Sequence, residues 1–179
     1  MKKILFILGV LTDADVDWLL YVGRREELAT GTVLIREGKP VDAVYIVLTG
    51  SLTVSIESLS GKKIAHLTSG EVVGEISFVD TRPPSATVTA TEETLVLSVP
   101  RQRLMNKLAD DTGFASRFYR AIALSLSDRL RNTVSLLGYG KELPSESVDL
   151  VDDLSPTVVE HLPLARSRFK FLLRRLRGY

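Results

Sequence analysis

Residues 73–88 read Val-Gly-Glu-Ile-Ser-Phe-Val-Asp-Thr-Arg-Pro-Pro-Ser-Ala-Thr-Val. The pair Gly74-Glu75 opens a short, helical turn in our interpretation, and the two prolines then bend the chain back toward a strand. Glycine allows a close approach of the backbone, and the N–H groups that follow it can converge on an anion as they do at a helix N-terminus. This stretch therefore predicts a connection between two strands that either is shaped to hold a phosphate or is a glycine turn with a Pro-Pro bend and no ligand.

The composition of the sequence around this stretch is typical of a β-sheet protein. Short runs rich in Val, Ile, Leu and Thr fill residues 31–100, and glycines separate them. Several runs alternate with a period of two, as the strands of a half-buried sheet do. Many short strands at such spacing favour a sandwich or a small jelly-roll barrel. The clearest strands are expected at residues 32–36, 43–48, 52–56, 85–91 and 95–99.

Helical patterns flank this β-rich region. Apolar residues at helix-like intervals predict a helix over residues 12–28, and further helices are expected over residues 102–108 and 113–137. In the last of these, an apolar residue recurs at every fourth position from Phe114 to Val134, and this stripe would either cover the barrel or pair with a second copy of the chain. The predicted fold class is α+β, a β jelly roll (double-stranded β-helix) with flanking helices.

The chain is long enough for one domain with appendages. Its 179 residues are 45% apolar, which is sufficient to bury one core. We expect this domain over residues 1–140, an acidic linker over residues 141–154 and a basic C-terminal helix over residues 155–179. The basic and then apolar start superficially resembles a secretion signal, but the apolar run is short and Thr12 is better interpreted as a helix N-cap.

Composition argues against several classes of site. The chain has no cysteine, so it has no disulfide, thiolate metal ligand or cysteine nucleophile. Its two histidines, His66 and His161, lie far apart, which is unlike the metal centre of an enzymatic jelly roll. We find no Ser/His/Asp arrangement with a positioning motif and no run near the ~20 apolar residues that span a bilayer. We therefore expect a cytoplasmic protein without catalytic activity, metal or cofactor.

Charge is balanced overall but not locally. The formal net charge of +1 does not predict wholesale binding of nucleic acid. Residues 165–179, however, contain six basic residues and no acidic one, and they also have an apolar face. Such a helix can lie on an anionic membrane or dock on an acidic partner, but we favour packing of its apolar face on its own domain.

Three blocks of the sequence resemble the cyclic-nucleotide-binding domain family. They are Gly-Thr-Val-Leu-Ile-Arg-Glu-Gly at residues 31–38, Asp-Ala-Val-Tyr-Ile-Val-Leu-Thr-Gly-Ser-Leu at residues 42–52 and Gly-Glu-Val-Val-Gly-Glu-Ile-Ser at residues 70–77. The family includes the bacterial catabolite activator protein and the regulatory subunits of cAMP-dependent protein kinase. The resemblance covers residues 11–140, and it implies that the third block begins a phosphate-binding cassette.

The resemblance implies a role for individual residues. Glu75 would accept a hydrogen bond from the ribose 2′-hydroxyl, the backbone around it would cradle sugar and phosphate, and the end of the cassette would reach the cyclic phosphate. The base would stack under the long helix, with Thr133 or Arg129 as purine contacts. The implied ligand-binding residues are Val73, Gly74, Glu75, Ile76, Ser77, Arg82, Pro84, Ser85, Ala86, Thr87 and Thr133.

One position departs from the family's pattern. The family's cassette has an arginine immediately before the residue that aligns with Ser85, and its guanidinium pairs with the phosphate, whereas this chain has Pro84 there. The loss of one charge-assisted bond weakens binding by roughly 10- to 100-fold. Arg82 could take the vacant place, although the two prolines restrict how the loop can aim it.

The implied function is a regulatory module that binds a cyclic nucleotide, cAMP or cGMP, and signals to a protein partner or through a homodimer of the long helix. The alternative is a degenerate domain that binds no nucleotide and serves as an interaction or scaffold module. DNA binding is not expected, because the residues beyond Gly138 are too few for the winged helix of the family's transcription factors.

Overall fold

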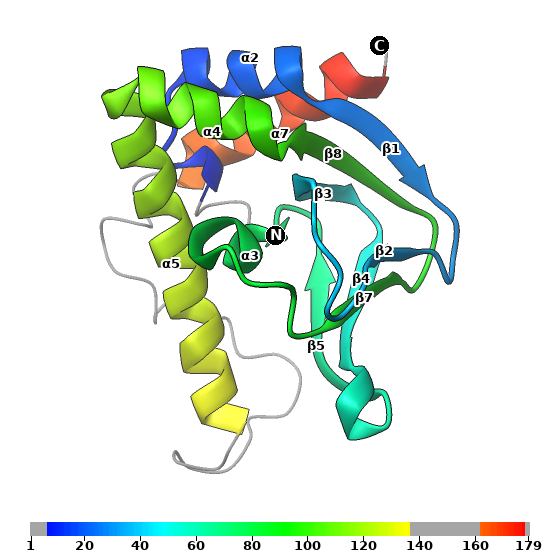
Figure 1. Ribbon diagram of the computed structural model, residues 1–179. Helices are drawn as coiled ribbons and strands as arrows, with labels where there is room; N and C mark the ends of the chain where they lie inside the picture. Colours follow the sequence, from blue (N-terminus) through cyan, green and yellow to red (C-terminus); the bar gives the residue numbers. More distant parts are fainter. Residues whose placement is uncertain (1–6, 137–161, 178–179) are drawn as a thin grey trace.

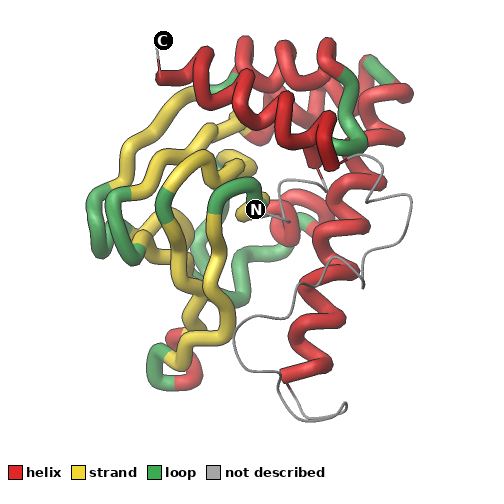
Figure 2. Tube along the Cα trace, turned by 180° about the vertical axis from the view of Figure 1, so that it is seen from behind, coloured by secondary structure: helices red, strands yellow, loops and turns green. Residues whose placement is uncertain are grey.

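The computed structural model describes residues 7–136 and 162–177. Two antiparallel sheets form a β-roll, and helices cover one end and one side of it (Figures 1 and 2). This arrangement confirms the predicted α+β class. One sheet has the order β1 (Arg24–Leu28), β8 (Thr94–Pro100), β3 (Ala43–Thr49), β6 (Val72–Val73), and the other has the order β2 (Val33–Ile35), β7 (Thr87–Ala90), β4 (Ser51–Ile56), β5 (Lys62–Thr68).

The helices divide into two groups. At one end of the roll lie α2 (Asp13–Val22), α4 (Arg101–Asp110) and α7 (Leu162–Arg177), as Figure 1 shows. The long helix α5 (Thr112–Leu136) runs along the side, and the short helix α3 (Glu75–Asp80) lies between α5 and the strands. A 3-10 turn, η1 (Glu57–Leu59), joins β4 to β5. Within the described ranges, no helix combines the length and the apolar character that crossing a bilayer requires.

The N-terminal helix is shorter than predicted. It begins as expected, because Thr12 caps it: the Thr12 hydroxyl accepts a hydrogen bond from the Asp15 N–H at 3.3 Å. It ends at Gly23, where a Cβ atom would lie 2.6 Å from a side-chain carbon of Leu97. Residues 24–28, predicted as helix, instead form β1 and pair with β8. Only Leu28 of this strand is buried, so the local sequence contains no strand pattern and the pairing with β8 decides the structure.

All five predicted strands are present with slightly different ends, and besides β1 two other strands, β5 and β6, were missed. Strand β5 lies at the edge of its sheet and is exposed over most of its length, so it lacks apolar alternation. Strand β6 has only two residues, both buried, which is too short for any periodicity to appear.

The apolar stripe of α5 has two parts. Phe114, Phe118 and Ile122 are buried in the core between the helices and the β1-β8-β3-β6 sheet, so this half of the stripe covers the domain. In contrast, Leu130 and Val134 are 65% and 44% exposed. Within the described residues, the far half of the stripe therefore presents an apolar surface.

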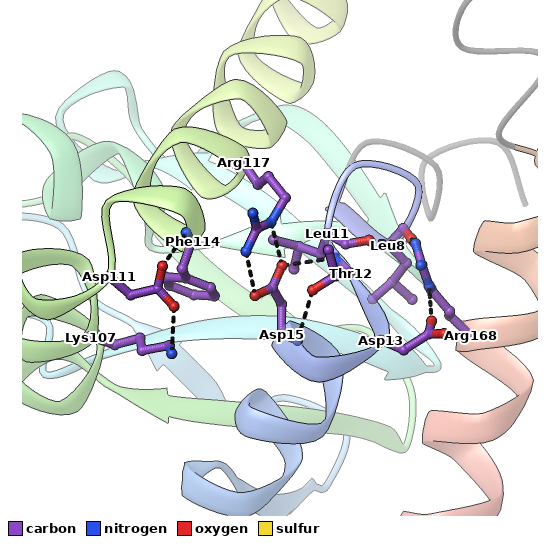
Figure 3. Close-up of polar contacts among 10 residues, drawn as sticks. All are labelled: Leu8, Leu11, Thr12, Asp13, Asp15, Lys107, Asp111, Phe114, Arg117 and Arg168. Atoms are coloured by element: carbon purple, nitrogen blue, oxygen red, sulfur yellow. Dashed lines mark hydrogen bonds and ion pairs between the residues drawn. The ribbon is translucent and has the colours of Figure 1, made fainter.

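The basic helix α7 packs on its own domain, as we favoured. Ala165, Phe169 and Leu172 are buried in the same core as the start of α5. Arg168 forms an ion pair with Asp13 at 2.6 Å and donates hydrogen bonds to the carbonyl oxygens of Leu8 and Leu11 (Figure 3). The proposed acidic linker, residues 141–154, and the predicted first turn of the last helix, residues 155–161, lie outside the described residues.

Candidate ligand site

The turn at Gly74 positions the first residue of the candidate site. Gly74 has a φ of 86°, a left-handed conformation that side chains disfavour, and it caps α3. A Cβ atom there would also lie 3.0 Å from the carbonyl oxygen of Ala43. Because the backbone turns here, the next residue, Glu75, points inward and is only 1% exposed. The turn thus buries a carboxylate at the start of α3.

Glu75 borders a small hollow of about 90 Å³ between α3, the strands and α5. Its apolar walls come from the interior of the roll, and most of its polar groups come from residues 74–86. Eight of the predicted ligand-binding residues line it, so the fold brings the two ends of the predicted cassette together. They are Val73, Gly74, Glu75, Ile76, Ser77, Pro84, Ser85 and Ala86.

A second charged side chain enters the hollow from α5. The guanidinium of Arg129 forms an ion pair with Glu75 and also donates a hydrogen bond to the carbonyl oxygen of Val72. Sequence reasoning named Arg129 only as a possible purine contact, whereas in the structure its partner is the carboxylate proposed for the ribose. Burial raises the pKa of Glu75, and the charge of Arg129 beside it partly offsets that rise.

Arg101 holds the far end of α3 in place, and the sequence analysis did not identify it. Its guanidinium donates a hydrogen bond to the carbonyl oxygen of Ser77 at 2.9 Å and lies 5.1 Å from the centre of the Phe78 ring. Arg101 is the first residue of α4 and directly follows Pro100. The local sequence gives no signal of its contact with α3, because the partners of Arg101 lie more than 20 residues earlier in the chain.

Three predicted site residues do not line the hollow. Thr87 faces the other side of its strand from Val88, and its hydroxyl donates to a carboxylate oxygen of Glu57 at 2.7 Å. Arg82 is exposed, and its backbone N–H donates to the carboxylate of Asp80 at 3.0 Å. Thr133 is exposed and donates to the carbonyl oxygen of Arg129 at 2.9 Å. In this structure, the side chains of these three residues therefore do not border the hollow.

Strand alternation explains the position of Thr87. Successive side chains of a strand point to opposite faces, so Ala86 and Val88 can both reach the hollow only if Thr87 points away from it. No local sequence signal marks the apolar wall of the hollow, because its residues come from four different strands. They are Ile35, Val54, Leu67 and Val88.

The hollow has the chemistry of a binding site. It combines an apolar wall with a buried carboxylate, a guanidinium and the hydroxyls of Ser77 and Ser85. Such a combination of apolar surface and a few converging polar groups is typical of small-molecule sites. Across residues 7–136 and 162–177, no group of three or more acidic or histidine side chains could hold a metal ion.

Comparison with known proteins gives consistent matches. Residues 25–111 match the family described as "Cyclic nucleotide-binding domain". The chain is 32% identical to the Pycsar effector protein PaPycTIR of Pseudomonas aeruginosa over 83% of its own length, and 32% identical to the cAMP-dependent protein kinase regulatory subunit of Blastocladiella emersonii over 54%. It spans only 44% and 24% of these two relatives.

One solved structure is similar to this chain over most of the length of both. It is the N-terminal domain of a transcriptional regulator from Streptomyces coelicolor, which superposes with a TM-score of 0.58 and 30% sequence identity. The match covers 72% of this chain and 90% of that one. The similarity therefore extends beyond the cassette to the roll and its helices.

Proposed function

Because this chain belongs to the cyclic nucleotide-binding domain family, we propose that it is a regulatory module that binds a ribonucleoside 3′,5′-cyclic monophosphate in the hollow at α3. The observation that carries the proposal is the position of Glu75. A carboxylate that is 1% exposed at the start of the cassette helix is costly to bury, and it lies where a ribose hydroxyl could donate to it. The adjacent Ser85 and the backbone of residues 74–77 are the groups that we assign to sugar and phosphate.

The output of the module would pass through α5. This helix contributes Arg129 to the hollow and exposes Leu130 and Val134 nearby, so a ligand that changes the position of α5 would also change an apolar surface that is available to a partner or a second copy. One relative is a kinase regulatory subunit by name, and another is an effector protein. We propose by analogy that occupancy is signalled to a protein partner.

The competing possibility is an interaction module that has kept the roll and lost the ligand. Two observations favour it: Pro84 replaces the cassette arginine, and Arg129 already occupies the side of the hollow next to Glu75. In this case Arg129 would stay bonded to Glu75, and no nucleotide would bind in the hollow at any concentration.

Thermal unfolding in the presence of nucleotide tests the proposal. We expect cAMP, cGMP, cCMP or cUMP at millimolar concentration to raise the Tm, because a ligand at 100 times its Kd stabilises the folded state by about 2.7 kcal/mol. The four bases are included because no described contact selects one of them. Glu75→Gln should abolish the shift, whereas Glu93→Gln, in an exposed turn, should preserve it. Absence of a shift with all four nucleotides would establish the ligand-free module instead.

A further inference from the structure

The charges around the hollow are unusual for a site that holds an anion. Among the described residues that line it, only Glu75 and Arg129 are charged. The loop from Asp80 to Ala86, which would face the phosphate, contributes a proline at the position next to Ser85 and no cation. A phosphate in this site would therefore need a positive charge from outside the cassette.

Arg82 is poorly placed to supply that charge. It does not line the hollow, and its side chain is exposed. Its backbone N–H is bonded to Asp80, and the two prolines that follow restrict the loop. Arg82 is thus the nearest cation in the sequence, but the fold does not place it in the hollow.

Arg129 is already inside the site. Two of its guanidinium nitrogens bond to Glu75 and to the Val72 carbonyl oxygen, while its buried Nε has no hydrogen-bond partner. An arginine carries five N–H donors, so this side chain has donors left for a further acceptor. A buried N–H without a partner is a cost that an incoming anion can remove.

A nucleotide cannot enter the hollow while the Arg129–Glu75 ion pair keeps its present place. The hollow measures about 90 Å³, whereas pockets for small organic ligands typically measure about 300–1,000 Å³. A ribose hydroxyl that donates to Glu75 must approach the carboxylate that Arg129 already contacts. Arg129 therefore has to move when a nucleotide enters, and its long side chain allows the guanidinium to remain near the site.

We propose that Arg129 is the anion-binding residue of this domain. The ribose hydroxyl displaces its guanidinium from Glu75, and the guanidinium then pairs with the cyclic phosphate in place of the cassette arginine that Pro84 replaces. This inference rests on the proposed function, and it differs from the family pattern because the phosphate is held by the long helix and not by the loop. Ligand binding would consequently act directly on α5.

The sign of one mutational effect tests this role. If Arg129 binds the phosphate, Arg129→Met should weaken binding of the cyclic nucleotide roughly 10- to 100-fold, because a charge-assisted bond is lost. The same change should not weaken binding of the matching nucleoside, since the nucleoside has no phosphate and its ribose no longer has to displace Arg129 from Glu75. If Arg129 only blocks the site, Arg129→Met should tighten binding of both compounds, and this result would overturn the proposal. Both affinities are measured by calorimetry at fixed ionic strength.

Three further variants test the interpretation. Pro84→Arg restores a cassette arginine and should rescue binding in the Arg129→Met background by more than it improves the wild-type protein, which is the mark of two residues that serve one function. Arg131→Met, exposed on the same helix, is the matched control and should bind as the wild type does. Arg129→Lys, which keeps the charge near Glu75, should give an intermediate loss and remains informative if Arg129→Met does not fold.

The two proposals can fail separately. If the wild-type protein binds none of the four cyclic nucleotides, the proposed function fails and this inference fails with it. If only Pro84→Arg binds, the site is competent but Arg129 does not replace the cassette arginine. If the wild type binds and Arg129→Met binds more tightly, the proposed function stands and the inference is wrong.

Discussion

At the scale of single residues, the turn at Gly74 sets the geometry of the candidate site. The residue combines a φ of 86° with a close approach to the carbonyl oxygen of Ala43. Gly38 has a similar φ of 72°, but no atom lies within 4 Å of the place where its Cβ would be. A comparison of Gly74 with Gly38 therefore distinguishes the cost of the left-handed backbone conformation, which both share, from the cost of steric contact, which only Gly74 has.

We predict that Gly74→Ala destabilises the fold more than Gly38→Ala does. Each substitution should cost about 1 kcal/mol for the left-handed conformation, and Gly74→Ala should add a further cost because the strand at Ala43 must shift. Gly74→Ala should also weaken nucleotide binding, since a shift there moves Glu75. Urea unfolding measures the free energies. Equal costs for the two variants would show that the contact with Ala43 does not constrain the turn.

At the scale of secondary-structure elements, an ion pair joins α2 to α5. Asp15 on α2 accepts two hydrogen bonds from the guanidinium of Arg117 on α5, at 2.6 and 2.9 Å, and also one from the backbone N–H of Thr12 (Figure 3). Burial alone would raise the pKa of Asp15, but the bonds from Arg117 and Thr12 outweigh it, and the pKa lies below its ordinary value of 3.8.

This pair predicts a pH dependence with a definite sign. Since the folded-state pKa of Asp15 is lower than the unfolded one, its contribution to stability is present above about pH 4 and is lost as the pH falls through the folded-state value. Asp15→Asn should cost about 1–3 kcal/mol near neutral pH, and its difference from the wild type should shrink in acid. The free energy of unfolding as a function of pH measures this difference.

The control for this prediction is Asp17→Asn. Asp17 is exposed on the same helix, so its replacement should change the free energy of unfolding by less than about 0.5 kcal/mol. A difference between wild type and Asp15→Asn that stays constant down to the acid transition would contradict the assigned role of the ion pair.

At the scale of the whole molecule, the first and last described helices share one core. Leu172 of α7 is fully buried there, whereas Leu164 of the same helix is 42% exposed. Trp18 of α2, the only tryptophan of the chain, packs against this core. The basic helix α7 thus contributes to the stability of the roll, although α7 and the strands of the roll lie far apart in the sequence.

We predict that Leu172→Ala destabilises the entire domain in one transition. It should cost about 2–5 kcal/mol, as the loss of a buried leucine typically does, while Leu164→Ala should cost less than about 1 kcal/mol. Far-UV circular dichroism and Trp18 fluorescence should report the same midpoint for each variant. An early transition confined to fluorescence would show that α7 detaches independently of the roll.

The accuracy of the sequence predictions depended on how local the signals were. The glycine turn at residue 74, the N-cap at Thr12 and the long helix were predicted because each is encoded within a few residues. Strand β1 was predicted as helix because its strand character comes from pairing with β8, about 70 residues away. Similarly, Arg101 and the partner of Arg129 could not be predicted, since both contacts join segments that lie far apart in the chain.

The sequence by itself determined the β-roll, because alternation, glycine punctuation and caps act over short distances. Its resemblance to a known family, and not these patterns, indicated where the cassette begins. Only the tertiary structure decided which side chains meet in the hollow. It turned Thr87 toward Glu57 and brought Arg129 from α5 onto Glu75. The physical reason is that strand pairing and helix packing choose the face that each side chain presents, and the electrostatics of a buried site depend on that choice.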